Sequence, residues 1–334
     1  MPGRAGARLT PLGLAVLVCL AVALLVAVAA AGGLLHGSGT PGGGPLPATA
    51  SAVLRAPAAT VTFDAAGGWL ADDQAGTVQR FDPVTGRLLG RAVEIGGRPV
   101  AAIAGYGRVW VADTADSQVW TLDPSTGAVK GGPIAVPDGP VSMAAGDGGI
   151  WVASVVAGAV SVIDPRTDEM AGTVGLPDGA VRIAVGAGDV WVTGQTDTLT
   201  RIESRGPGLT MTWHAVRVGR APLGVAFGDG SVWVANVQSA TVARVDPATL
   251  RVTASYPVGS PGQPISPEAV ALWEGRLWVS DGQQGEVVAL DPDAGTQAGS
   301  PVSLPGVARQ LVLDGDGGLW ATTSNPGTVV HFTS

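Results

Sequence analysis

The stretch Gly228-Asp229-Gly230-Ser231-Val232-Trp233-Val234-Ala235 contains the pattern that decides the fold. Two glycines precede a short apolar run with a tryptophan at its centre, and an apolar run bounded by turn residues is typical of a buried strand. The same run recurs along the chain at intervals of 41, 41, 40, 42, 45 and 42 residues, with the tryptophans Trp69, Trp110, Trp151, Trp191, Trp233, Trp278 and Trp320. A period of this length indicates seven structural repeats.

Turn residues separate the strands within each repeat. Six repeats have a glycine three positions before the tryptophan, where a tight hairpin needs positive φ: Gly107, Gly148, Gly188, Gly230, Gly275 and Gly317. Five repeats have an Asp-Pro turn thirteen residues after the tryptophan: Asp82-Pro83, Asp123-Pro124, Asp164-Pro165, Asp246-Pro247 and Asp291-Pro292. The fourth repeat lacks this pair and has Glu203 in its place, so Ser204 to Thr212 is predicted to be an irregular loop.

The fold class follows from the number of strands in each repeat. Four antiparallel strands, repeated seven times, predict an all-β, seven-bladed β-propeller over residues 51–334. The seventh repeat has only three strands, whereas an orphan apolar run, Ser51 to Arg55, precedes the first repeat. We expect this run to close the ring as the outer strand of the seventh blade, because closure removes exposed strand edges.

An apolar segment precedes the predicted propeller. Residues 10–35 carry no charge from Leu12 to Leu35, and about 20 apolar residues are enough for a helix to cross a bilayer. This length predicts a transmembrane signal-anchor helix, while the small residues at 27–31 leave a cleaved signal peptide as the alternative. Residues 36–50 are rich in Gly, Pro, Ser and Thr and are predicted to form a flexible linker.

Arg4 and Arg8 set the expected orientation of this segment. Positive residues flanking a membrane helix stay in the cytoplasm, so residues 1–9 are predicted to be a short cytoplasmic terminus. The propeller is then expected outside the cytoplasm, on a single-pass protein of the cell membrane. Cleavage of the segment would give a secreted protein.

Composition excludes several functional classes. The net charge is -8, and 19 basic residues against 27 acidic ones form no basic patch, so no nucleic-acid partner is expected. The one cysteine, Cys19, excludes an intrachain disulfide and a thiolate metal site. Only His36, His214 and His331 are available for histidine chemistry. No cofactor, metal site or catalytic residue is therefore predicted.

The repeat motif resembles a known group of proteins. The run GxG-x-VWVA with a following D-P-x-T-G turn, as in Asp123-Pro124-Ser125-Thr126-Gly127, is similar to YVTN-type extracellular β-propeller repeats and their streptogramin lyase-like and NHL-type relatives. The resemblance covers residues 55–334 and implies a propeller that is a binding module, a scaffold or, in a few members, an enzyme. It also implies that a lyase would hold magnesium with histidines and carboxylates in the channel, and neither His214 nor His331 is at a matching position. For a lactonase-like metal site, the inner strands offer mainly Glu268.

Two groups of polar residues are predicted on one face of the propeller. The loops that lead into the inner strands are small or apolar apart from the candidate channel-mouth residues Arg98, Ser142, Arg182, Glu268, Arg309 and Gln310. Arginines there would bind a carboxylate or phosphate, or would pair with Glu268 instead. Three positions after their tryptophans stand the candidate rim residues Asp72, Asp113, Asn236 and Asp281. They would bind a polar ligand, a peptide or a divalent ion, or would cap their own turns.

The tryptophans divide into two groups. The seven that keep the repeat period are expected in the core between blades. Trp120, Trp213 and Trp273 lie outside the period and are better candidates for exposed contacts, although packing between blades explains such residues more often than binding does.

The sequence thus predicts a membrane-anchored extracytoplasmic propeller. Its expected role is that of a non-enzymatic binding or scaffold module for a protein, a cell-wall polymer or a small polar ligand outside the cell. One alternative is an extracytoplasmic lyase or hydrolase of the streptogramin lyase-like or lactonase-like type. The other is a sensor propeller that works with a separate kinase.

Overall fold

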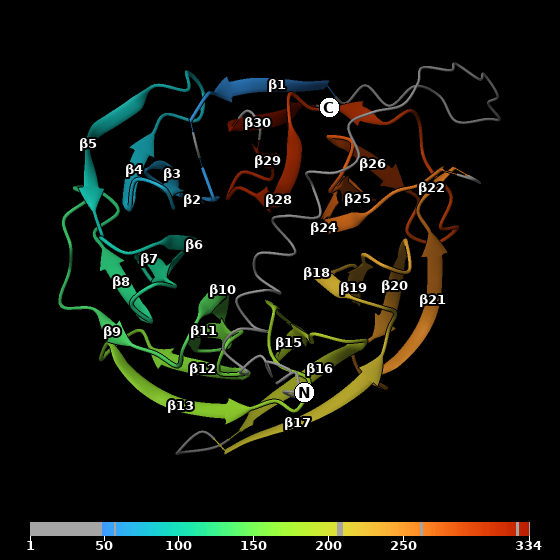
Figure 1. The fold of residues 1–334 in the computed structure, drawn as a ribbon, viewed down its shortest axis with the longest axis horizontal. Helices are drawn as coiled ribbons and strands as arrows, with labels where there is room; N and C mark the ends of the chain where they lie inside the picture. The colour runs from blue at the N-terminus through green and yellow to red at the C-terminus, as the bar shows by residue number, and fades with distance from the viewer. Residues whose placement is uncertain (1–48, 57, 206–209, 261–262, 325–326, 334) are drawn as a thin grey trace, which may run out of the picture. The chain divides into compact units, whose positions relative to one another are not determined.

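Seven four-stranded antiparallel sheets surround a central axis (Figure 1), so the predicted seven-bladed propeller is confirmed. The computed structural model describes residues 49–334 except 57, 206–209, 261–262, 325–326 and 334. The predicted cytoplasmic, membrane and most linker residues lie outside this part. Within it, no helix has the length and hydrophobicity needed to cross a membrane.

The first four blades follow the chain in order. Blade 1 contains β2 (Thr60–Asp64), β3 (Gly67–Asp72), β4 (Thr77–Phe81) and β5 (Leu88–Glu94). Blade 2 contains β6 (Pro99–Gly105), β7 (Arg108–Asp113), β8 (Gln118–Leu122) and β9 (Ile134–Ala135). Blade 3 contains β10 (Pro140–Gly146), β11 (Gly149–Ser154), β12 (Ala159–Asp164) and β13 (Glu169–Gly175). Blade 4 contains β14 (Arg182–Gly186), β15 (Asp189–Thr193), β16 (Thr198–Arg205) and β17 (Thr210–Arg217).

The last three blades complete the ring. Blade 5 contains β18 (Pro222–Gly228), β19 (Ser231–Asn236), β20 (Thr241–Asp246) and β21 (Arg251–Pro257), and a small hairpin of β22 (Gly259–Ser260) and β23 (Gln263–Pro264) follows it. Blade 6 contains β24 (Pro267–Trp273), β25 (Arg276–Asp281), β26 (Glu286–Leu290) and β27 (Val302–Ser303). Blade 7 contains β28 (Val307–Leu313), β29 (Leu319–Ser324), β30 (Thr328–Thr333) and β1 (Thr49–Leu54). The first strand of each blade is innermost, as β6, β18 and β24 show in Figure 1.

The orphan N-terminal run closes the ring as predicted. Strand β1 pairs antiparallel with β30, with Ser51 opposite His331 and Ala52 opposite Val330. It begins at Thr49, inside the stretch that the sequence assigned to the linker. Val53 and Leu54 pack against the buried cluster that contains Phe81 of blade 1. Strand β1 therefore completes blade 7 and also contacts blade 1.

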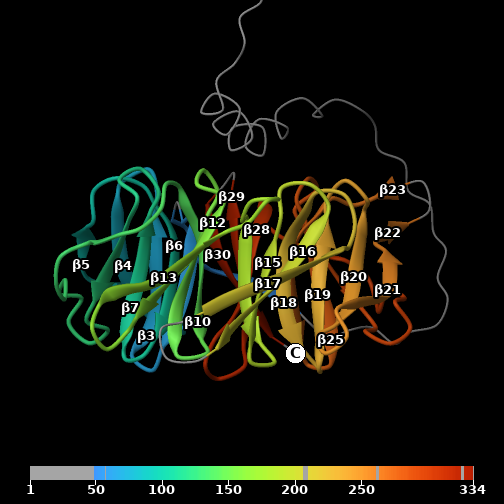
Figure 2. The same ribbon diagram turned by 90° about the horizontal axis from the view of Figure 1, so that it is seen from below.

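The prediction of an irregular loop from Ser204 to Thr212 in blade 4 is wrong at both ends of that segment, while residues 206–209 lie outside the described part. Strands β16 and β17 continue as a long hairpin, in which Glu203 lies opposite Thr212 and Ser204 lies opposite Met211. The Asp-Pro turn that ends the third strand in five other blades is absent here, so no local signal stops the ladder. Figure 2 shows β17 crossing the outside of the propeller.

The tryptophans that keep the repeat period form the core between blades. Their side chains are fully or almost fully buried, as predicted. Arginines on the third strands cover two of them, with Arg80 over Trp69 and Arg244 over Trp233. The same guanidinium groups donate hydrogen bonds to the Asp-Pro turn of the next blade, Arg80 to the carbonyl of Ser125. These arginines therefore join core packing to the contacts between blades.

The tryptophans outside the period have different environments. Trp273 is only 6% exposed and donates its indole N–H to the carbonyl of Gly317 in blade 7. Trp120 is half-buried, while Trp213 on β17 is 39% exposed. The expectation of exposure is thus confirmed for Trp213 and wrong for Trp273, which helps to hold blades 6 and 7 together.

Candidate functional site

One register position on the inner strands separates an apolar sector from a charged one. In each inner strand one residue pairs with the blade tryptophan, as Ala271 pairs with Trp278 in blade 6. The position in question lies three residues earlier, near the start of the inner strand. In blades 2 to 5 this position is apolar and half-buried: Val100, Val141, Val181 and Leu223. In blades 6 and 7 it is Glu268 and Arg309. In the described part of the chain, no other strand lies between these inner strands and the axis. Half-buried side chains at this position can therefore be reached by a ligand near the axis.

Arg182, Glu268 and Arg309, which we call the axial cluster, come from three different blades. The Arg309 Nη1 lies 4.0 Å from the Glu268 Oε2, and the two side chains are 28% and 12% exposed. The Arg309 Nε donates a hydrogen bond of 3.0 Å to the Ser324 hydroxyl on the neighbouring strand β29. The pairing of Glu268 with an arginine, which the sequence left as an alternative to ligand binding, is therefore present.

Burial raises the pKa of Glu268 to about 6. The positive charges of Arg309 and Arg182 act in the opposite direction and lower this pKa, while the nearby Asp281 carboxylate raises it. Arg182 influences Glu268 although its strand β14 lies two blades away, which places both residues near the axis. The carboxyl of Glu268 thus titrates close to neutrality, between two guanidinium groups and a second carboxylate.

Asp281 is a fully buried neighbour of this cluster. Its Oδ1 accepts hydrogen bonds from the backbone N–H groups of Ser266 and Gln283, whereas its Oδ2 has no hydrogen-bond partner in the described structure. The next residue, Gly282, has no side chain to obstruct Glu268, since a Cβ there would lie 2.2 Å from the Glu268 Oε1. Blade 6 therefore brings two carboxylates to one end of its inner strands.

Two other predicted channel-mouth residues connect blades. The Gln310 Oε1 accepts hydrogen bonds from the Thr60 hydroxyl at 3.0 Å and the Val61 N–H at 3.2 Å, both in blade 1. The Ser142 hydroxyl accepts one from the Ile183 N–H of blade 4 at 3.3 Å. These contacts give both side chains a structural role.

Arg98 also differs from the axial cluster. Its side chain is 57% exposed and forms a 3.0 Å ion pair with Asp73 of blade 1. Its backbone N–H donates to the Asp113 Oδ1. An exposed ion pair of this kind adds little stability. Arg98 therefore offers a matched control for substitutions of the half-buried Arg309.

The predicted rim residues mostly lie below the surface. Asp113, Asn236 and Asp281 are fully buried. Their side chains turn inward to satisfy loop groups: Asp113 accepts from the N–H groups of Ala115 and Asp116, and Asn236 donates to the carbonyl of Val218. Asp72 is half-buried and accepts from two N–H groups of its own turn. The alternative of turn capping describes all four residues.

The two histidines in the described part lie away from the axial cluster. His214 is exposed on the outer strand β17, and His331 stacks on Trp320 at a centroid distance of 4.2 Å. No group of three or more His, Cys, Asp or Glu side chains suited to a metal ion occurs within the residues that the structure describes.

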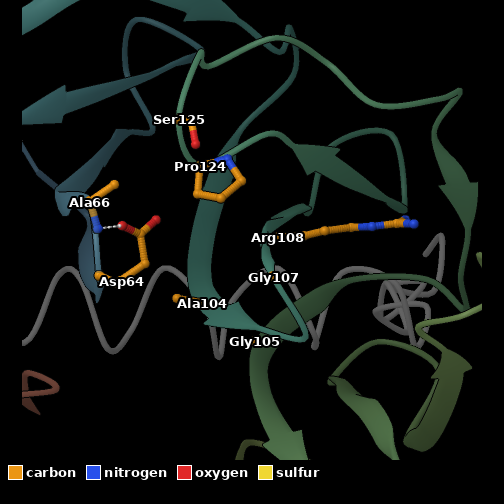
Figure 3. A pocket seen from close by; sticks show the side chains of 9 residues that line it. Asp64, Ala66, Ala104, Gly105, Gly107, Arg108, Pro124 and Ser125 are labelled. Atoms are coloured by element: carbon orange, nitrogen blue, oxygen red, sulfur yellow. Dashed lines mark hydrogen bonds between the residues drawn. The ribbon is translucent and has the colours of Figure 1, made fainter.

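A hollow of about 510 Å³ lies at the opposite end of the inner strands from the axial cluster, between the turns of blades 1 and 2 (Figure 3). Its two charged residues already have structural partners. Asp64 accepts hydrogen bonds from the Ala66 N–H and the Trp69 indole, and Arg108 pairs with Asp168 of blade 3. Figure 3 shows the Arg108 side chain directed away from Asp64. The two charged side chains that line this hollow are therefore engaged with other parts of the protein.

Comparison with known proteins shows the fold and no family. No family model matches this chain, and no curated protein matches its sequence. A structure of streptogramin B lyase has a TM-score of 0.71 at 15% identity over 86% of this chain and 97% of its own. Selenomethionine-substituted virginiamycin B lyase from Staphylococcus aureus has a TM-score of 0.71 at 14% identity, over 86% and 99%. The Neurospora crassa Pan2 WD40 domain has a TM-score of 0.67 at 12% identity, over 85% and 95%.

These neighbours include a lyase and a WD40 domain, and identities this low establish only a shared propeller fold. The resemblance to YVTN-type repeats stays a prediction. The function must therefore be argued from the site.

We expect Glu268→Gln to stabilise the protein at neutral pH. A carboxyl whose pKa is about 6 in the folded chain and 4.5 when unconstrained makes the folded state less stable above pH 6. The substitution should raise the free energy of unfolding by about 1–2 kcal/mol near neutrality, since one pKa unit corresponds to about 1.4 kcal/mol. The extra stability of the variant should shrink as pH falls from 6 to 4.5, because Glu268 then takes up a proton in the folded parent and is uncharged like the glutamine. Urea unfolding over this pH range measures it, and a variant less stable than the parent at neutral pH would contradict the assignment.

Proposed function

We propose that this chain is a non-enzymatic, membrane-anchored extracytoplasmic binding module whose axial cluster holds a polar ligand. The observation that carries the proposal is the convergence of Arg182, Glu268 and Arg309 from three blades onto one end of the axis. Charged side chains are costly to bury, and three of them that come from different blades to one place are suited to holding a polar ligand.

Two further features support a binding role. Neither His214 nor His331 lies at the axial cluster, so the histidine and carboxylate arrangement that the lyase resemblance implies has no counterpart in the described residues. The rest of the axial face is apolar or structural, with Gln310 and Ser142 engaged between blades. The membrane anchor and the location outside the cytoplasm are supported by the apolar residues 10–35 and by Arg4 and Arg8 before them.

One observation favours the lyase or hydrolase alternative. Glu268 has a pKa of about 6 and lies beside a second carboxylate, Asp281, and a carboxyl that titrates near neutrality is suited to general acid or base chemistry. Turnover of a bound compound that depends on Glu268 would support this alternative over simple binding.

We expect ligand-induced stabilisation that depends on the axial arginines. The melting temperature of the full chain would be measured with divalent metals, a chelator, sugars, nucleotides and peptides, and again for the Arg182→Ala, Arg309→Ala variant and the Arg98→Ala control. A compound present at about a hundred times its Kd adds about 2.7 kcal/mol, which is a readily measured rise. The rise should be lost in the double variant and kept in the control. An equal rise in all three proteins, or no rise with any compound, would contradict binding at the axial cluster and leave a protein-binding platform as the better role.

A further inference from the structure

We propose that the axial cluster binds a carboxylate ligand with an apolar body, and that Glu268 is a built-in competitor which the ligand's carboxylate displaces from Arg309. This inference rests on the proposed function and narrows it to one ligand class. Three observations carry it: the orientation of the Arg309 guanidinium, the balance of charges around Glu268, and the apolar sector across the axis.

The Arg309 guanidinium is oriented but incompletely used. Within the described part of the chain its hydrogen bond runs from Nε to the Ser324 hydroxyl, and its contact with Glu268, at 4.0 Å, is longer than a hydrogen bond. A guanidinium has five N–H donors in a planar fork, and a carboxylate fits this fork with two parallel hydrogen bonds. Ser324 therefore fixes the plane of a group whose terminal nitrogens can still bind an anion.

The charges around Glu268 favour an anion over a cation. Arg309 faces it from β28, Arg182 from β14 and Asp281 from β25, while β18 contributes no charge: its Gly224 packs so close that a Cβ would lie 2.6 Å from the Glu268 carbonyl oxygen. Two guanidinium groups balance two carboxylates when Glu268 is ionised. A cationic ligand would be repelled by two guanidinium groups. An anionic ligand would be attracted by them once Glu268 is no longer charged.

Glu268 can give up its charge by taking a proton. Its pKa of about 6 places this step near neutrality. The Asp281 carboxylate favours this step, because its negative charge raises the pKa of Glu268. Protonation removes the anion that competes for Arg309, so ligand binding and proton uptake should be coupled.

The apolar sector accounts for the rest of the ligand. Val100, Val141, Val181 and Leu223 occupy the register position of Glu268 and Arg309 in blades 2 to 5, and all four are half-buried. A ligand whose carboxylate lies on Arg309 in blade 7 therefore meets methyl groups from the facing blades. Ligand sites commonly combine an apolar wall with a few placed polar groups.

The decisive experiment is calorimetric titration of the full chain with phenylbutyrate, its neutral amide and the corresponding phenylbutylamine, at about pH 5.5 and about pH 8. We expect the carboxylate to bind at least about tenfold more tightly than the amide or the amine, and about tenfold more tightly at the lower pH. Glu268→Gln should bind the carboxylate at the higher pH as tightly as the parent does at the lower pH. A gain of binding cannot result from misfolding.

Arginine variants complete the test. Arg309→Lys keeps the charge but loses the fork and should weaken carboxylate binding about tenfold, whereas the exposed Arg98→Ala should leave it unchanged. If the amine or the amide binds in an arginine-dependent way as tightly as the carboxylate, this inference is overturned while the proposed function stands. If all three compounds fail to bind and the broader melting screen shows no arginine-dependent ligand, both are overturned. Unchanged carboxylate binding in Glu268→Gln at the higher pH also overturns the role of Glu268.

Discussion

A chain that begins at residue 59 is expected to aggregate or to lose its cooperative melting transition. The deletion removes β1 (Thr49–Leu54), which supplies the fourth strand of blade 7 and pairs with β30. Burying one apolar side chain of the size of Val53 or Leu54 contributes about 1.5–3 kcal/mol when complete, and each ladder hydrogen bond adds about 1 kcal/mol. The loss is therefore roughly 5 kcal/mol, which approaches the whole stability of many domains. It also exposes the edge of β30, which can then pair with another chain.

The matched control begins at residue 44, five residues before β1. This chain lacks the predicted membrane segment but keeps β1, so it separates ring closure from removal of the N-terminal residues. Thermal unfolding and light scattering of the two chains give the comparison. Equal melting temperatures would show that β1 does not hold the ring closed.

The sequence was sufficient to predict the ring, because each blade repeats its own turn chemistry. The glycines before the tryptophans have positive φ, for example 66° at Gly230 and 67° at Gly275. The Asp-Pro turns form as expected, with the Asp82 Oδ1 accepting from the N–H groups of Val84 and Thr85. The Thr85 side chain, followed by these two backbone groups, lowers the pKa of Asp82. Turn residues of this kind predict where a strand ends without information about residues far away in the sequence.

Blade 4 shows where local signals fail. The hairpin of β16 and β17 has no Asp-Pro turn, and its length is set by pairing across the strands, such as Ile202 opposite Trp213. The small hairpin of β22 and β23 was likewise not predicted, because two-residue strands leave no hydrophobic period in the sequence.

The candidate site was predicted only in part, because its contacts cross the ring. The pairing of Glu268 with an arginine was anticipated, yet the influence of Arg182 from two blades away depends on the geometry of the closed ring. The sequence position of Gln310 predicts a ligand-binding residue, but its side chain accepts a hydrogen bond from Thr60, which is 250 residues earlier in the chain. A polar residue on an inner strand is equally suited to a ligand and to a neighbouring blade, and its sequence position does not distinguish them.

Glycines in the loops that lead into the inner strands also indicate which polar side chains turn inward. A Cβ at residue 97 would lie 2.1 Å from the Asp113 Oδ2, and one at residue 219 would lie 2.5 Å from the Asn236 Cγ. A glycine in the loop that leads into an inner strand therefore accompanies an inward-turned polar side chain. This pairing indicates a capping role for Asp113 and Asn236.

Trp233→Ala should destabilise the propeller by about 3–5 kcal/mol, the usual cost of removing a large buried side chain. Trp233 is fully buried and packs with Leu277 of the next blade, so its loss opens a cavity at the contact between blades 5 and 6. It also deprives Arg244 of the ring that its guanidinium covers at 5.3 Å, and Tyr256 of its stacking partner. Chemical unfolding of the purified variant measures the change in the free energy of unfolding.

Trp213→Ala provides the same change of side chain outside the repeat period. Trp213 is 39% exposed on the outer strand β17, so its substitution should remove much less packing and cost about 1 kcal/mol or less. Similar losses for the two variants would mean that burial between blades does not set the energetic role of a tryptophan in this chain. A large difference would instead show that the repeat period marks the residues that hold the blades together, because Trp233 contacts two blades whereas Trp213 lies at the edge of one.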